Sequence, residues 1–124
     1  MNRKIIIIVA VFIVAVVTIY FFREGIAERR FKSKADKLAR KIPEKYREAY
    51  EEEFHYNINK FWSAYENGLV SKNDLIDVTD YIDDLNRKEE LSRKEVFDFL
   101  DYVSRIYTDG IRKNFQKESQ NSSG

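Results

Sequence analysis

Residues 5–22 read IIIIVAVFIVAVVTIYFF, and this stretch decides the fold because it contains no charged residue. Fourteen of its eighteen residues are Ile, Val or Phe. In hydrocarbon every backbone N–H and C=O group must be bonded within the segment, so a single apolar run becomes a helix. Such a helix would be roughly 27 Å long, close to the apolar thickness of a bilayer. We therefore predict a short tail and one transmembrane anchor within residues 1–22.

A cleaved signal peptide is the alternative interpretation of this stretch. Basic residues at 3–4 precede it, and residues 25–27 have the small-x-small pattern of a cleavage site. The apolar run is longer than the roughly 7–15 residues usual in a signal peptide. Arg23 and Glu24 also interrupt the approach to Ala27. We expect the anchor to be retained.

Two groups of basic residues favour opposite orientations of the chain in the membrane. The basic tail at 3–4 favours an N-terminus kept inside and a domain carried outside. More basic residues follow the run and favour the reverse; they are Arg23, Arg29, Arg30, Lys32, Lys34 and Lys37. Because charge orients a segment less strongly when a long domain follows, we expect an extracytoplasmic domain.

Composition limits the chemistry of the remaining chain. There is no cysteine, which excludes disulfides, thiolate metal sites and cysteine nucleophiles. One Pro, four Gly and 35% charged residues favour long helices. Charge is segregated: residues 23–47 hold ten Lys or Arg and four Asp or Glu, whereas residues 48–101 hold six and fifteen. The chain is thus basic beside the apolar run and acidic farther along.

Residues 23–42 are predicted to form a basic juxtamembrane helix that continues the anchor. Its apolar side chains recur at helical spacing, namely Ala27, Phe31, Ala35, Leu38 and Ile42. Pro43 disfavours helix at the preceding residue and suits the first turn of a new helix. We expect an acidic helical domain over residues 43–116 and a disordered polar tail over residues 117–124.

The first helix of that domain is expected at about 44–67. It carries an aromatic stripe of Tyr46, Tyr50, Phe54, Ile58, Phe61, Trp62 and Tyr65, and Gly68 follows at the C-terminal cap. Two further helices form an internal repeat, because residues 71–82 align with residues 92–103 at an offset of 21. Each copy opens with a serine followed three residues later by an acid, which is the pattern of a capping box.

The two repeat copies are expected to fold back on each other as an antiparallel helical hairpin. One apolar face would comprise Leu75, Ile76, Thr79 and Ile82, and the other Val96, Phe97, Leu100, Val103, Tyr107 and Ile111. The fold class is therefore all-α: one transmembrane helix followed by a bundle of about four helices, counting the juxtamembrane helix.

A repeat of capped amphipathic helices resembles the helix–turn–helix units of tetratricopeptide-like proteins. The layout as a whole resembles single-pass membrane proteins of thermophilic bacteria that carry a small helical soluble domain. This resemblance implies a scaffold for protein–protein contact and no catalytic residue.

Residue types that carry catalysis are sparse. His55 stands alone, and without a second histidine we interpret it as a half-buried helix residue. There is no phosphate-binding glycine motif and no G-x-S-x-G. The aspartates at 77, 80, 98 and 101 lack the spacing of a calcium loop and are expected to face water. We expect no enzyme activity, cofactor, metal, nucleic acid or small-molecule substrate.

The aromatic stripe is the main candidate for a partner-binding surface. A helix of roughly 36 Å carries it, and the expected hairpin helix at 72–86 is only about 22 Å long. Some of the stripe should stay uncovered for a protein partner, most simply a second copy in a homodimer, at Tyr50, Phe54, Phe61, Trp62 and Tyr65. Internal cover by the last helix and the juxtamembrane helix is the alternative.

We therefore predict a membrane-anchored interaction or assembly module that associates with itself. The alternative is a structural membrane protein whose basic segment contacts anionic lipid headgroups through Arg29, Arg30, Lys32 and Lys34.

Overall fold

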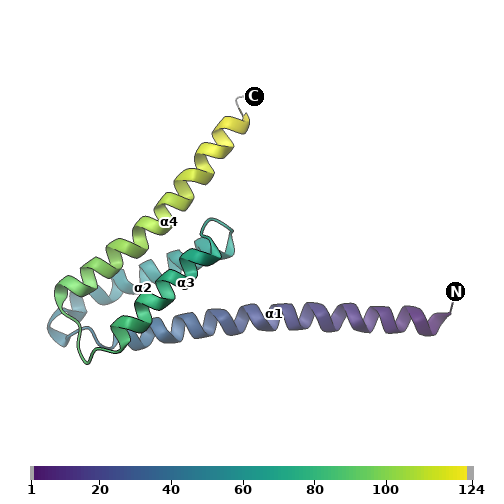
Figure 1. The fold of residues 1–124 in the computed structure, drawn as a ribbon, viewed down its shortest axis with the longest axis horizontal. Coiled ribbons are helices and arrows are strands. Elements are labelled where there is room, and N and C mark those ends of the chain that lie inside the picture. The colour runs from purple at the N-terminus through teal and green to yellow at the C-terminus, as the bar shows by residue number, and fades with distance from the viewer. Residues whose placement is uncertain (1, 123–124) are drawn as a thin grey trace. The chain divides into compact units, whose positions relative to one another are not determined.

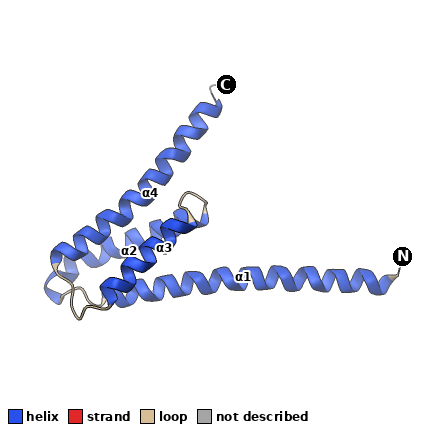
Figure 2. Ribbon diagram, in the orientation of Figure 1, coloured by secondary structure: helices blue, strands red, loops and turns tan. Residues whose placement is uncertain are grey.

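The computed structural model describes residues 2–122, apart from the side chains of Phe21, Glu24, Asn121 and Ser122. These residues form four helices and no strand (Figures 1 and 2): α1 (Arg3–Ala39), α2 (Glu44–Glu66), α3 (Lys72–Asn86) and α4 (Arg93–Ser122). The all-α fold class, with a long apolar N-terminal helix ahead of a helical bundle, is confirmed. The chain divides into two compact units, Met1–Phe31 and Lys32–Gly124.

The first unit contains the apolar part of α1. Its large apolar side chains are exposed along the helix, from Ile5 at 51% to Phe22 at 68%. The hydroxyl of Thr18 donates to the carbonyl of Val14 at 2.8 Å, so the helix satisfies this polar group itself. Within the described residues, α1 is the one helix that could cross a membrane by length and composition.

In the second unit, the turn between α1 and α2 follows from a proline and an arginine. Pro43 was expected in the first turn of α2. It lies one position earlier, as the N-cap residue, with extended backbone angles (φ −54°, ψ 140°). Arg47 reaches back and donates from Nη2 to the carbonyls of Arg40 (3.2 Å) and Ile42 (3.3 Å). These carbonyls lie just beyond the end of α1, where helices leave acceptors without backbone partners.

Gly68 ends α2 as expected. Its φ of 74° is in the left-handed region that glycine adopts without a steric cost. The N–H of Gly68 donates to Tyr65 (3.1 Å), and the N–H of Leu69 donates to Ala64 (2.9 Å). This pair of bonds is the Schellman arrangement, which turns the chain sharply toward α3.

Both predicted serine caps are present at the starts of α3 and α4. The hydroxyl of Ser71 accepts from the N–H of Asp74 at 3.1 Å. Ser92 accepts from the N–H of Glu95 at 3.2 Å, and the Glu95 carboxylate accepts from the N–H of Ser92 at 3.0 Å. Only the second pair is a complete capping box, because the aspartate side chain is one carbon shorter than glutamate.

The core of the bundle lies where α4 packs chiefly on α2 and also on α3 (Figure 1). Phe99 is at its centre: its ring lies 5.8 Å from that of Phe54 in α2 and 5.3 Å from that of Tyr81 in α3. The most completely buried side chains come from α2, α3 and α4, from the end of α1 and from two connections between helices. They include Leu38, Ile42, Phe54, Phe61, Ile82, Leu91, Val96, Phe99 and Val103. Burying these side chains supplies the main driving force for folding.

The expected buried faces of α3 and α4 are wrong at three positions. Ile76 is 48% exposed, Phe97 is 58% exposed and Ile111 is 38% exposed, whereas Val78 and Phe99 are buried. A single hairpin would need one narrow apolar stripe on each helix. Because α4 packs against both α2 and α3, its buried arc is rotated toward Phe99, and Phe97 is left outside.

The expected disordered tail is also wrong as far as the structure describes it. Helix α4 continues to Ser122, and residues 123–124 lie outside the described part of the chain. Residues 111–120 are exposed, and Figure 1 shows this end of α4 extending past α2 and α3. Most residues of this segment are compatible with helix, so its polar character was a poor guide to disorder.

Candidate functional site

The predicted lipid-contacting residues fall into two groups. Arg29 and Arg30 are exposed. Lys34 is engaged within the bundle, because its ammonium lies 3.1 Å from a carboxylate oxygen of Asp83 and its carbonyl accepts from Asn86 at 3.2 Å. Lys32 is half-buried. Contact with headgroups stays a prediction for all four residues, and Lys34 in addition joins the end of α1 to α3.

The predicted partner-binding stripe of α2 is mostly interior. Phe54, Phe61 and Trp62 are 1%, 0% and 5% exposed, so the expectation that they stay uncovered is wrong. The internal alternative applies here, because α4 packs along α2 and covers this face. Tyr50 and Tyr65 are half-buried, and a role in partner binding stays a prediction for these two.

Hydrogen bonds hold the edges of this stripe. The hydroxyl of Tyr50 accepts from Nε of Arg93 at 3.0 Å, which joins α2 to the start of α4. Trp62 donates from Nε1 to a carboxylate oxygen of Glu66 at 2.7 Å. The aromatic stripe of α2 therefore packs mainly inside the bundle, and the polar atoms of Tyr50 and Trp62 form hydrogen bonds near the surface.

A buried polar pair joins α2 to α4 and was not predicted. The hydroxyl of Tyr107 donates to Oδ1 of Asn57 at 2.7 Å, and Nδ2 of Asn57 donates to the carbonyl of Glu53 at 2.8 Å. Burial raises the pKa of the Tyr107 hydroxyl. In the sequence, the one indication of this pair was Asn57, an amide that stands among the regularly spaced apolar residues of α2. The pair fixes the register of the two helices, because a buried amide needs its partner.

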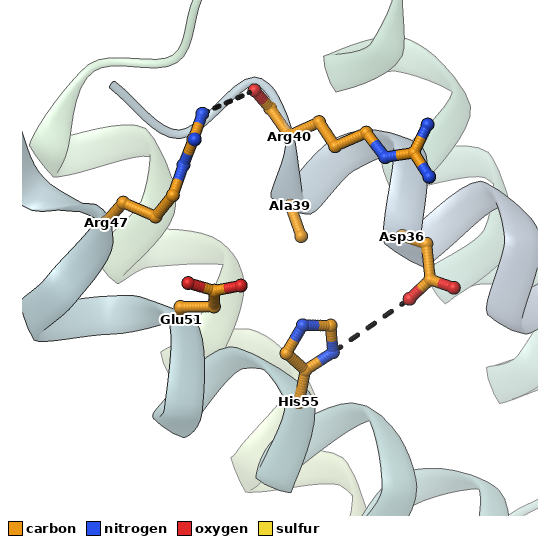
Figure 3. A pocket seen from close by; sticks show the side chains of 6 residues that line it. All are labelled: Asp36, Ala39, Arg40, Arg47, Glu51 and His55. Atoms are coloured by element: carbon orange, nitrogen blue, oxygen red, sulfur yellow. Dashed lines mark hydrogen bonds and ion pairs between the residues drawn. The ribbon is translucent and has the colours of Figure 1, made fainter. Parts of the chain in front are cut away.

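An open pocket of about 250 Å³ lies between the end of α1 and α2 (Figure 3). It is lined by Asp36, Ala39, Arg40, Arg47, Glu51 and His55. Figure 3 shows the Asp36 carboxylate and the His55 ring turned toward each other, with 3.9 Å between Oδ1 and Nδ1. The side chains of His55 and Asp36 are 44% and 59% exposed, so water reaches both. Within residues 2–122, no three His, Asp or Glu side chains converge as a metal site would require.

A second pocket, of about 470 Å³, lies where the turn after α2 meets α4. Its lining includes Leu69, Asp74, Asp109, Gly110 and Lys113. At its base α4 approaches the turn so closely that a Cβ atom added at Gly110 would overlap the carbonyl oxygen of Leu69. Gly110 is therefore required for packing, and this role was not predicted from the sequence.

Exposed apolar side chains on α4 form the remaining candidate. Phe97, Ile111 and Phe115 are 58%, 38% and 72% exposed. Phe97 and Phe115 lie 18 positions apart, so these side chains are spread along the helix rather than gathered in one patch; together they make α4 a candidate contact surface.

No family model, curated protein or solved structure matches this chain. The resemblance to tetratricopeptide-like units and to single-pass membrane proteins of thermophiles gains no support from these comparisons and stays a prediction.

Proposed function

We propose that the protein is a membrane-anchored interaction module that associates with itself. The observation that carries this proposal is the pairing, in one chain, of an exposed apolar helix long enough to span a bilayer with a bundle whose α4 leaves large apolar side chains uncovered. The surface differs from the one expected from the sequence, since the stripe of α2 is largely interior. Anchoring concentrates copies in one plane, so a modest surface suffices for association.

The test is energy transfer between copies of the full-length chain in lipid vesicles. The chain has no cysteine, so a Glu89→Cys variant carries one fluorophore in the exposed connection between α3 and α4. We expect donor- and acceptor-labelled copies to transfer energy at low protein-to-lipid ratio. An excess of unlabelled protein should abolish the transfer, and an unrelated single-pass helix should not. Transfer no greater than that of randomly mixed anchors would contradict self-association.

A further inference from the structure

The exposed apolar side chains of α4 belong to a regular row. We name this row the outer seam; it consists of Phe97, Asp101, Ser104, Thr108, Ile111 and Phe115. Its members are alternately four and three residues apart, the spacing at which one helix packs along another in a coiled coil. The bulky residues lie toward the ends of the seam and the small ones at its middle, where the helices could approach closely.

Two of the three polar members of the outer seam have partners within α4. The hydroxyl of Ser104 donates to the carbonyl of Asp101 at 3.0 Å. The carboxylate of Asp101 accepts from Nε of Arg105 at 3.0 Å within the same helix. Covering the seam therefore leaves both of these bonds in place, and the remaining cost is the water that the Asp101 carboxylate loses.

The order of residues along the seam is self-complementary when two copies run in opposite directions. Phe97 then faces Phe115 of the second copy, and Ser104 faces Thr108 of the second copy. Asp101 lies opposite Ile111 of the second copy. In the parallel arrangement Asp101 would meet its own equivalent, so two like charges would share one layer of the interface. The antiparallel arrangement avoids this repulsion.

Charges beside the seam favour the same arrangement. Asp98 and Arg112 are both exposed and each follows a seam residue on the same side of α4. In the antiparallel pair, Asp98 of each copy lies beside Arg112 of the other, which gives two attractive pairs. Arg105 lies near the twofold axis and therefore beside Arg105 of the second copy. Its ion pair with Asp101 offsets the repulsion between these two like charges.

We infer that the outer seam of α4 pairs with the outer seam of a second copy, antiparallel and about a twofold axis near residue 106. This inference rests on the proposed function, because three large apolar side chains per copy cover less than the roughly 800 Å² per partner of a stable interface. Anchored copies meet at raised effective concentration and need less area. A twofold contact of this kind is closed and produces dimers rather than chains.

The test uses the same full-length protein in vesicles, with variants that change the seam alone. Phe115→Ser should weaken association at least tenfold, and the neighbouring off-seam variant Gln116→Ser should leave it unchanged. Asp98→Arg and Arg112→Asp should each weaken it by about tenfold, and the double variant should recover to within about twofold, because both pairs re-form with reversed sign. Circular dichroism checks that each variant keeps its helix content.

Orientation is measured separately by the distance between spin labels on Glu89→Cys copies. The antiparallel pair places these labels roughly 50 Å apart. A principal distance below roughly 30 Å would overturn the inferred orientation. If the wild type self-associates but Phe115→Ser does not weaken it, or the charge-reversed double variant is not restored, the seam is not the interface and the proposed function stands. If the wild type does not self-associate, the proposed function itself fails.

Discussion

Glu95 shows how one side chain fixes the start of a helix. One carboxylate oxygen accepts from the backbone N–H of Ser92, and the other is paired with the ammonium of Lys88. The hydrogen bond from Lys88, followed by that from Ser92, lowers the pKa of Glu95 from 4.5 to about 2. The carboxylate is thus favoured in its charged form by groups on both sides of the α3–α4 connection.

The corresponding prediction concerns the pH dependence of stability in Glu95→Gln. Because the folded pKa is lowered, the stabilisation from the charged group is complete above pH 4.5 and is lost as the pH falls toward about 2. Glutamine keeps an oxygen for the N–H of Ser92 but cannot pair with Lys88. Denaturant unfolding should show the wild type more stable than the variant above pH 4.5, with the difference vanishing near pH 2. A difference independent of pH would contradict the assignment, and Glu90→Gln serves as the control at an exposed position.

Between elements, α4 approaches the turn after α2 closely at Gly110. Gly110 has no room for a Cβ atom, because the carbonyl oxygen of Leu69 occupies that position. The turn is itself held by the Schellman bonds of Gly68 and Leu69, so it cannot move away without losing them. The position of α4 along α2 therefore depends on this glycine as well as on Asn57 and Tyr107.

We predict that Gly110→Ala lowers the free energy of unfolding by roughly 2–3 kcal/mol, the cost of inserting a methyl group into a tightly packed contact. This loss exceeds the gain of about 1 kcal/mol that alanine gives over glycine inside a helix. Gly25→Ala is the matched control, since nothing lies within 4 Å of a Cβ added there. Thermal unfolding followed by circular dichroism measures both variants. Equal stability of Gly110→Ala and the wild type would refute the close contact.

The sequence predicted the end of α2 and the starts of α3 and α4 because local residues determine them. Gly68 needs a positive φ and the serines at 71 and 92 accept from the following turn, whatever the rest of the fold does. The buried faces were predicted less well because neighbouring helices determine them. Phe97 and Phe99 are equally apolar, and only the packing of α4 against α2 and α3 decides which one is buried.

The candidate surfaces were also predicted only as far as local residues determine them. Apolar spacing correctly marked α2 as a helix with an aromatic face, but it could not show that α4 covers that face. The continuation of α4 past the bundle depends on a polar segment without an apolar period, which gave no signal for a helix. The close contact at Gly110 joins residues 41 positions apart, and no local pattern records it.

For the whole molecule, the proposed function depends on attachment to a membrane. The basic segment beside the apolar run and the acidic bundle beyond it match the charge distribution expected of an anchored domain near anionic headgroups. In the proposed pairing, anchoring would make the small outer seam sufficient for association, because it would raise the local concentration of copies. Removing the anchor should therefore weaken pairing even if the bundle stays folded.

The most direct test is flotation of membranes that contain the full-length protein after a wash in alkaline carbonate, which strips proteins that do not span the bilayer. The account predicts that the intact chain floats with the lipid and that its mature N-terminus precedes residue 5. Release of the protein into the wash, or a mature chain that begins near Glu28, would contradict the account.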